Sequence, residues 1–145
     1  MLQMLYYAIY VPPETEPPPL AIIKLPEIRQ YATNFGNRDG DMGILAFEND
    51  SIIGMSWIRL IHGYGYVDDE TPELTIAIIP ESRGKGVGTM MLRQLMQDAS
   101  PHYSKISLSV QLTNPAYKLY QRIGFTDYRV NDTSVTMVLK LDSAF

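Results

Sequence analysis

The sequence predicts a single α/β domain over residues 1–145, because a strand–turn–helix unit is flanked by further strands and helices. The unit begins with the apolar run 74–79, whose length and Ile content are typical of a strand buried on both faces. Pro80 ends this strand because proline has no N–H to give to a sheet. A turn with glycine at positions 84, 86 and 88 then leads into a helix. The apolar face of that helix recurs at three- and four-residue spacing over Val87, Met91, Leu92, Leu95, Met96 and Ala99.

Composition limits the classes of function. The chain has 145 residues, of which 46% are hydrophobic, enough to build a core. It has no cysteine, which excludes a disulfide, a thiol nucleophile and a Cys-based metal site and suits a reducing cytoplasm. We expect no metal and a cytoplasmic location. A net charge of −4 and a pI of about 5.1 argue against nucleic acid as a partner. No apolar run reaches the roughly 18 residues of a membrane span, so we expect no membrane contact.

The N-terminal third predicts two helices. Residues 1–11 have apolar side chains at helical spacing and lack the positive region and cleavage site of a signal peptide. Prolines within 12–19 impose an extended segment. Pro26 is favourable at a first helical position, and Gly36 supplies the end of the second helix. The apolar stripe of this second helix is Ile28, Tyr31, Ala32 and Phe35.

The middle of the chain predicts two strands, 42–47 and 52–60, joined by a turn at 48–51. Trp57 is expected in the core. The segment 64–70 has the composition of a loop. The strand–turn–helix unit at 74–99 follows.

The C-terminal part begins with the β-rich run 106–110. If the preceding helix is a right-handed crossover, this run is a parallel neighbour of strand 74–79. Thr113 or Asn114 then caps a helix that starts at Pro115 and ends at Gly124. Two closing strands are predicted at 127–130 and 134–141.

The glycine turn has the features of a phosphate site, because it leaves backbone N–H groups free at a helix N-terminus with no Cβ atoms in the way. A P-loop needs Gly-x-x-x-x-Gly-Lys-Ser/Thr, but Lys85 is followed by Gly86. A dinucleotide fingerprint needs Gly-x-Gly-x-x-Gly, but the turn reads Gly-x-Gly-x-Gly. A third pattern, Arg/Gln-x-x-Gly-x-Gly/Ala, is matched at every fixed position by residues 83–88.

This third pattern resembles the pyrophosphate-binding loop of the GNAT family of N-acetyltransferases, which hold acetyl-coenzyme A. The alternative for the loop alone is an ordinary strand–helix turn. Residues 114–125 resemble the second signature of the family, Asn-x-x-x-x-Leu-Tyr-x-x-x-Gly-Phe, and they lie in the expected order and separation. The resemblance covers roughly residues 41–141.

The resemblance implies a mixed, mostly antiparallel sheet with helices on both faces. It also implies a strand ahead of the first helix, and none is visible here. Either the chain is shortened at its N-terminus or a partner covers the open sheet edge.

The resemblance further implies the residues that bind the cofactor. The glycine turn would hold the pyrophosphate, and Lys85 would add charge nearby or simply be solvated. The pantetheine arm would pair with strand 74–79, which requires that strand to splay from its parallel neighbour. Asn114 matches a position that contacts the cofactor in the family, and helix capping is its alternative role. The predicted cofactor-binding residues are Ile76, Ala77, Ile78, Arg83, Gly84, Lys85, Gly86, Val87, Gly88, Thr89, Asn114 and Tyr117.

The resemblance also implies the chemistry. Tyr120 stands at the tyrosine that serves as general acid toward the leaving thiolate, and a core tyrosine is its alternative role. Glu73 heads the central strand, where some members carry a glutamate that removes the amine proton directly or through water. His62 is a second candidate base. A backbone N–H near Ile78 would stabilise the oxyanion.

The expected function is direct acetyl transfer from acetyl-CoA to a primary amine, without a covalent enzyme intermediate. Three alternatives remain: a non-catalytic acyl-CoA sensor, an enzyme using another acyl-CoA donor, and an unrelated nucleotide-binding protein. The acceptor is not specified, and a homodimer is compatible with the sequence. Asp68, Asp69 and Glu70 form either a solvated loop or a negative lip that favours a small cationic amine.

Overall fold

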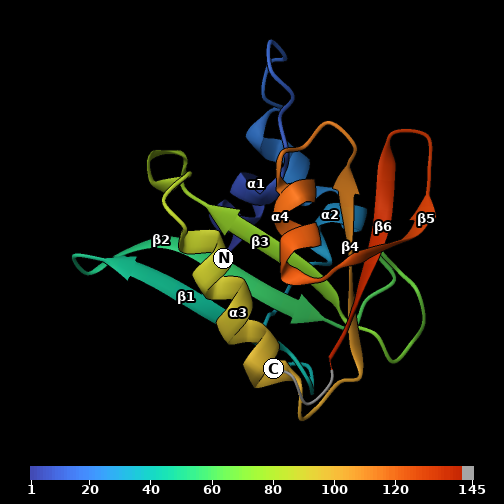
Figure 1. Cartoon of the computed structure of the whole chain (residues 1–145). Coiled ribbons are helices and arrows are strands. Elements are labelled where there is room, and N and C mark those ends of the chain that lie inside the picture. Colours follow the sequence, from blue (N-terminus) through green and yellow to red (C-terminus); the bar gives the residue numbers. More distant parts are fainter. Residues whose placement is uncertain (142–145) are drawn as a thin grey trace.

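The computed structural model describes residues 1–141, so the last four residues of the predicted domain lie outside the described part. Six strands of this part form one sheet in the order β1-β2-β3-β4-β6-β5 (Figure 1). The strands are β1 Met42–Glu48, β2 Ser51–Arg59, β3 Glu73–Ile78, β4 Lys105–Gln111, β5 Thr126–Val130 and β6 Ser134–Lys140. The β3–β4 pair is parallel and the other pairs are antiparallel, which confirms the predicted mixed, mostly antiparallel sheet.

Helices cover both faces of the sheet, as predicted (Figure 1). On one face lie α1 Leu2–Ala8, a 3-10 turn at Leu20–Lys24 and α2 Pro26–Arg29, and on the other lie α3 Val87–Ala99 and α4 Ala116–Ile123. Successive side chains of a strand point to opposite faces. The fully buried Trp57 therefore packs in the α1 and α2 core, and its neighbour Ile58 packs in the α3 and α4 core.

The first element of the described chain is α1, and no strand precedes it there. The edge strand β1 is one border of the sheet and exposes Leu45 and Phe47. In the described residues no helix is both long and apolar enough to cross a bilayer.

The second helix is much shorter than the sequence predicts, because it is α-helical only over Pro26–Arg29 and continues as turns. Side chains of β2 donate hydrogen bonds to the backbone carbonyl groups that would accept helical hydrogen bonds in a longer helix. The Arg59 Nη1 donates to the carbonyls of residues 30 and 33, at 3.1 and 2.6 Å. The Trp57 Nε1 donates to the carbonyl of Tyr31 at 2.8 Å. Tertiary hydrogen bonds thus replace helical ones, while the predicted apolar side chains still face the core.

The same Arg59 forms a buried ion pair that fixes this segment. Its Nε and Nη2 donate to the two oxygens of Asp41 at 3.0 and 2.9 Å, and the two side chains are 1% and 2% exposed. Burial alone would raise the pKa of Asp41. The hydrogen bonds from Arg59 and from the backbone N–H of Gly36 and Arg38 outweigh burial, so the pKa lies below its usual value.

Candidate functional site

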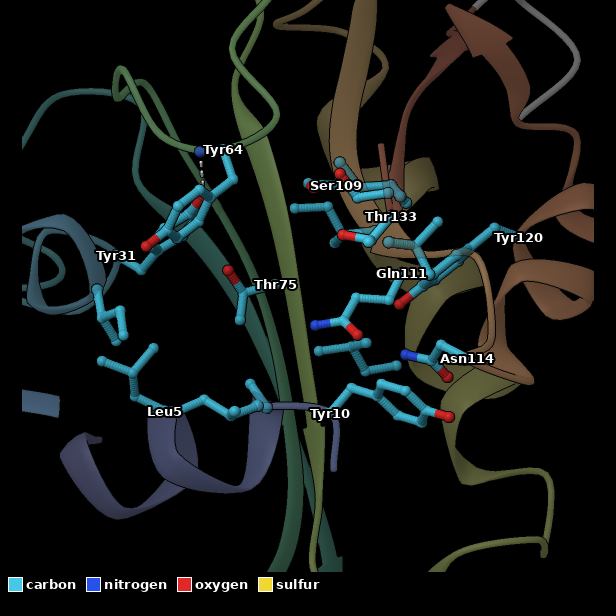
Figure 2. Close-up of a pocket in the computed structure, with 18 residues that line it drawn as sticks. Leu5, Tyr10, Tyr31, Tyr64, Thr75, Ser109, Gln111, Asn114, Tyr120 and Thr133 are labelled. Atoms are coloured by element: carbon cyan, nitrogen blue, oxygen red, sulfur yellow. Dashed lines mark hydrogen bonds between the residues drawn. The ribbon is translucent and has the colours of Figure 1, made fainter. Parts of the chain in front are cut away.

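The strands β3 and β4 meet at one end only. Glu73 pairs with Ser107, and no other pair between these strands occurs in the described part of the chain. Next to this pair, the Ser107 N–H donates to the carbonyl of Pro72 at 3.0 Å. Beyond it the strands diverge and leave a cavity of about 470 Å³, so the splay required by the sequence hypothesis is present (Figure 2).

Both strands and both helical faces line this cavity. Residues from the strands are Leu74, Thr75 and Ile76 of β3 and Leu108, Ser109, Val110 and Gln111 of β4. The other lining residues are Leu5, Ala8, Ile9, Tyr10, Ile28, Tyr31, Tyr64, Asn114, Tyr120, Thr133 and Ser134. Figure 2 shows Leu5, Tyr31 and Tyr64 on one side of Thr75, and Gln111, Asn114 and Tyr120 on the other.

The backbone of β3 directs polar groups into the splay. The Ile79 N–H donates to the carbonyl of Ile53 at 2.9 Å, so odd-numbered residues of this segment bond toward β2. Because the backbone groups of a strand alternate in direction, the N–H groups of Ile76 and Ile78 point away from β2. Ala77 is paired with Met55, so its backbone groups face β2 and its side chain lies in the core. The three predicted positions therefore differ: the N–H groups of Ile76 and Ile78 point away from β2, and of these two residues only Ile76 lines the cavity.

The three glycines of the turn have different roles. Gly84 and Gly86 have φ of 76° and 82°, and a Cβ on either would meet open space. Gly88 is packed closely, since a Cβ there would lie 3.3 Å from Ile78 Cδ1 and 3.4 Å from Ile76 Cδ1. Gly86 precedes α3 without a side-chain cap, which leaves the first N–H groups of the helix free. The turn thus presents free N–H groups at a helix N-terminus and has open space in front of them, which suits the binding of an anion.

Arg83 braces the turn and does not point into it. Its Nε donates to the carbonyl of Ile78 at 3.0 Å, and its Nη2 donates to the carbonyl of Tyr7 at 3.2 Å. The side chain thereby ties the end of β3 to α1. Lys85 is exposed and Thr89 is half-buried in the first turn of α3.

Tyr120 combines burial with access to the cavity. It is 7% exposed, it lines the cavity, and its hydroxyl points into that space (Figure 2). Its ring meets the edge of Phe125 at a centroid distance of 5.8 Å. Gly124, with φ of 125°, ends the helix, and its N–H and that of Phe125 both donate to the carbonyl of Tyr120. Burial raises the pKa of the Tyr120 phenol above its ordinary value, so the hydroxyl stays protonated at neutral pH.

Two further predicted cofactor residues lie on α4 or just before it. Asn114 lines the cavity and accepts a hydrogen bond from the Ala116 N–H at 2.9 Å, but the residue at the N-cap of α4 is Pro115. A cofactor contact by Asn114 stays a prediction. Tyr117 does not line the cavity. Its hydroxyl donates to the carboxylate of Asp127 at 2.8 Å. A cofactor contact by Tyr117 stays a prediction.

Glu73 lies behind the cavity wall. It is 1% exposed, and its oxygens accept hydrogen bonds from the N–H groups of Gly63 at 2.6 Å and Gly65 at 2.8 Å. The Tyr31 hydroxyl donates to Glu73 Oε1 at 2.9 Å and accepts from the Tyr64 N–H at 2.8 Å. Burial raises the pKa of Glu73 in spite of these hydrogen bonds. Burial and the nearby Glu73 charge also raise the pKa of Tyr31. Tyr31 therefore stands between the cavity and the carboxylate.

The acidic loop does not form a lip on this cavity. Asp68 is paired with Lys105 at 3.0 Å, and Asp69 contacts His62 Nε2 at 2.8 Å. A hydrogen bond from the Thr71 hydroxyl, together with the Lys105 pair, lowers the pKa of Asp68 to about 2. None of these residues lines the cavity as described. His62 is likewise outside it.

Sequence reasoning missed several residues of the cavity wall. In the sequence Tyr31 belongs only to an apolar helical stripe, and Tyr64 and Tyr10 lie in no motif. The Tyr10 hydroxyl donates to the carbonyl of Thr113 at 3.0 Å, across 103 residues of chain. The proline segment 12–19 does not line the cavity. Among the described residues, no group of three His, Asp or Glu is arranged to hold a metal ion.

Comparison with known proteins places this geometry in a family. The model of the acetyltransferase (GNAT) family matches residues 5–125. No curated protein matches the chain at a significant level. Solved structures similar in fold include the yncA protein of Salmonella typhimurium with its cofactor acetyl-CoA, at 19% identity and a TM-score of 0.63 over 88% of this chain and 77% of that one.

Two other solved structures have the same fold. The PaiA N-acetyltransferase of Thermoplasma acidophilum, in complex with coenzyme A, is 16% identical with a TM-score of 0.64 over 96% of this chain and 89% of that one. The ribosomal-protein-S18-alanine N-acetyltransferase of Escherichia coli is 20% identical with a TM-score of 0.62 over 81% of this chain and 79% of that one.

Proposed function

Because the chain belongs to the acetyltransferase (GNAT) family, we propose that it transfers the acetyl group of acetyl-CoA directly to a primary amine. One observation carries this proposal. The divergence of β3 and β4 opens a cavity with free N–H donors on one wall and the Tyr120 hydroxyl on the other. Relatives of the same fold solved with acetyl-CoA and with coenzyme A support the choice of donor. We further propose that residues 1–145 act as one catalytic domain in the cytoplasm.

The glycine turn is proposed to hold the diphosphate of the cofactor. Free N–H groups at the start of α3, together with the helix dipole, attract an anion, and the open space at Gly84 and Gly86 leaves room for it. The Ile76 N–H would pair with an amide of the pantetheine arm. Anchoring the cofactor at the turn and along β3 fixes the position of the thioester relative to the amine.

The leaving group requires a proton, and Tyr120 is the proposed source. Acetyl-CoA supplies the activated acetyl group as a thioester. The Ile78 N–H polarises its carbonyl and stabilises the negative charge that develops on the oxygen. As the amine nitrogen bonds to the carbonyl carbon and the carbon–sulfur bond breaks, the Tyr120 hydroxyl gives its proton to the sulfur. A raised pKa suits this role because the phenol is still protonated when the thiolate leaves.

The amine must lose a proton before or during attack, and we propose Glu73 as the final acceptor. Its carboxylate has no access to the cavity of its own, but the Tyr31 hydroxyl, which lines the cavity, donates to it at 2.9 Å. Tyr31 would accept the proton of the amine on its oxygen as it passes its own proton to Glu73. The Gly63 and Gly65 N–H groups hold the carboxylate in place for this transfer.

A thiol-release assay tests the proposal. The chain has no cysteine, so Ellman's reagent reports only the coenzyme A that is set free. We expect release that depends on both acetyl-CoA and an amine, with an acetylated product detected by mass spectrometry. If succinyl-CoA or a longer acyl-CoA is strongly preferred, the donor is wrong. If calorimetry shows coenzyme A binding but no amine gives turnover, the chain is a sensor and the enzymatic proposal fails.

A further inference from the structure

The cavity wall opposite Tyr120 is apolar and aromatic. It is supplied by α1, by the segment around α2 and by the loop that precedes β3 (Figure 2). Its side chains are Leu5, Ala8, Ile9, Ile28, Tyr31 and Tyr64. Within the described part of the chain, no Asp, Glu, Lys or Arg lines any part of the cavity.

Two tyrosines give this wall a defined shape. The Tyr31 and Tyr64 rings are stacked with an interplanar angle of 16° and a centroid distance of 6.4 Å. The hydrogen bond from the Tyr64 N–H to the Tyr31 hydroxyl fixes their relative position. Tyr64 is 59% exposed, so one ring lies at the mouth of the cavity and the other lies deeper, against Glu73.

The charged groups near this wall are occupied or lie outside it. Glu73 is already bound by three donors and is separated from the cavity by Tyr31. Asp68 and Asp69 are paired with Lys105 and His62. Glu27 is exposed and lies outside the cavity, close enough to Tyr64 that its charge adds to burial in raising the pKa of that phenol. A second charge on a ligand would therefore have no charged partner inside the cavity, and burying it there would be unfavourable.

We infer that this wall is the acceptor site and that it selects a primary amine carried on an uncharged, apolar or aromatic body. The inference rests on the proposed acetyl transfer and names the acceptor class for it. The amine nitrogen lies at the Tyr31 hydroxyl, whose proton path to Glu73 is in place. The body packs against Ile28 and Tyr64, where apolar contact stabilises the bound state. The acidic residues 68–70 do not line this site.

A panel of four amines at saturating acetyl-CoA tests the inference. The amines are 2-phenylethylamine, 1,5-diaminopentane, phenylalanine and a peptide that begins with phenylalanine. We expect kcat/KM for 2-phenylethylamine to exceed that for the diamine and for phenylalanine by about tenfold or more, because these carry an extra charge. A peptide that matches or exceeds 2-phenylethylamine also supports the acceptor class, and it identifies a peptide N-terminus as the source of the amine.

Other results would distinguish a failure of the acceptor class from a failure of the proposed acetyl transfer. A diamine or amino acid used as well as 2-phenylethylamine overturns the acceptor class and leaves acetyl transfer standing. If no amine gives turnover while calorimetry shows coenzyme A bound, acetyl transfer fails and the acceptor class fails with it. A loss of diamine activity in Glu27→Gln by tenfold, in a parent that prefers the diamine, would identify Glu27 as the cation partner and would also overturn the inference.

Matched tyrosine variants locate the site. Tyr64→Ala is expected to raise KM for 2-phenylethylamine by about tenfold, with KM for acetyl-CoA unchanged, because it removes half of the aromatic stack. Tyr128→Ala removes a tyrosine that is 53% exposed on β5 and outside the cavity, and it should change neither constant. Circular dichroism checks that both variants fold. Equal effects of the two substitutions, or none from Tyr64→Ala, would contradict the assignment.

Discussion

Glu73 pairs with Ser107, and this pair is the apex from which β3 and β4 diverge. The Ser107 side chain at the apex is fully buried, and its hydroxyl has no hydrogen-bond partner among the described residues. The site thus lies beside a polar group that the fold leaves unsatisfied.

Removing that hydroxyl should not weaken the fold. Ser107→Ala is expected to leave the free energy of unfolding unchanged or to raise it by about 1 kcal/mol, because a buried hydroxyl without a partner is unfavourable. Ser56→Ala is the matched control. Ser56 is equally buried but donates to the carbonyl of Thr75 at 3.2 Å, so its loss should cost about 1 kcal/mol. Urea denaturation compares the two, and a larger loss for Ser107→Ala would contradict the account.

Two glycines with positive φ test whether the glycine turn binds an anion. Gly86 and Gly36 have φ of 82° and 97°, and a Cβ on either would meet open space. Replacing either by alanine should cost about 1 kcal/mol of stability because of the positive φ. Only Gly86→Ala is expected to weaken coenzyme A binding, by about tenfold or more, because its Cβ stands where the anion would lie. Calorimetric Kd values that rise equally in both variants would show that the effect is one of stability alone.

Tyr120→Phe should lower kcat by about a hundredfold, because the proposed general acid is removed while the ring remains. The Kd for coenzyme A should hardly change. Tyr103→Phe is the control, since Tyr103 donates to the carbonyl of Gly40 far from the cavity and its loss should not affect kcat. Steady-state kinetics measures both, and a Tyr120→Phe enzyme with the parent kcat rules out the acid role.

The path from Tyr31 to Glu73 predicts a pH dependence. The pKa of Glu73 is raised above 4.5, so the carboxylate becomes protonated, and kcat/KM falls, as pH decreases through that raised value. Glu73→Gln and Tyr31→Phe should each lower kcat/KM by about tenfold or more, and Glu73→Gln should also remove this acidic limb. Tyr66→Phe, which loses only an exposed hydrogen bond to Asp69, serves as the control. An unchanged pH profile in Glu73→Gln would show that a group other than Glu73 accepts the amine proton.

The raised pKa of Glu73 also determines how Glu73 makes the stability of the fold depend on pH. The folded protein holds the Glu73 proton more tightly than the unfolded chain does. The contribution of Glu73 to stability therefore decreases as pH rises from the unfolded pKa through the raised folded value.

The Arg59–Asp41 pair predicts the opposite pH response. The pKa of Asp41 is lowered in the folded state, so its contribution to stability is present above the unfolded pKa and is lost as pH falls through the folded value. Asp41→Asn should destabilise the protein by about 3 kcal/mol or more at pH 7, because it leaves the buried Arg59 charge unpaired. Urea denaturation at pH 7 and pH 3 should show a smaller difference for the variant. A parent whose stability is equal at both pH values contradicts this.

Local patterns were sufficient for most of the fold. The strand at 74–79 and the helix after it differ from β3 and α3 by a residue or less at each end, because hydrophobic periodicity and the Pro80 and glycine signals all agreed. The second helix was predicted to be too long because tertiary contacts shorten it. Side chains of β2, which lies over 20 residues later in the chain, capture its carbonyl groups, and no local pattern reports such capture.

Only some residues of the candidate site could be predicted from the sequence. The glycine turn, Tyr120 and Asn114 could be assigned because each lies within a short motif. Tyr31 and Tyr64 could not, since their roles depend on hydrogen bonds across 42 and 33 residues. The charge of residues 68–70 could not decide between a solvated loop and a negative lip, because the pairing of Asp68 with Lys105 is not visible in the sequence.

A crystal structure with bound coenzyme A would show whether the cofactor lies between the glycine turn and Tyr120. We expect the diphosphate on the N–H groups of residues 84–88, the pantetheine arm in the splay between β3 and β4, and the sulfur at hydrogen-bond distance from the Tyr120 hydroxyl. An empty glycine turn, or a sulfur bound on the far side of the sheet from that hydroxyl, would contradict this expectation.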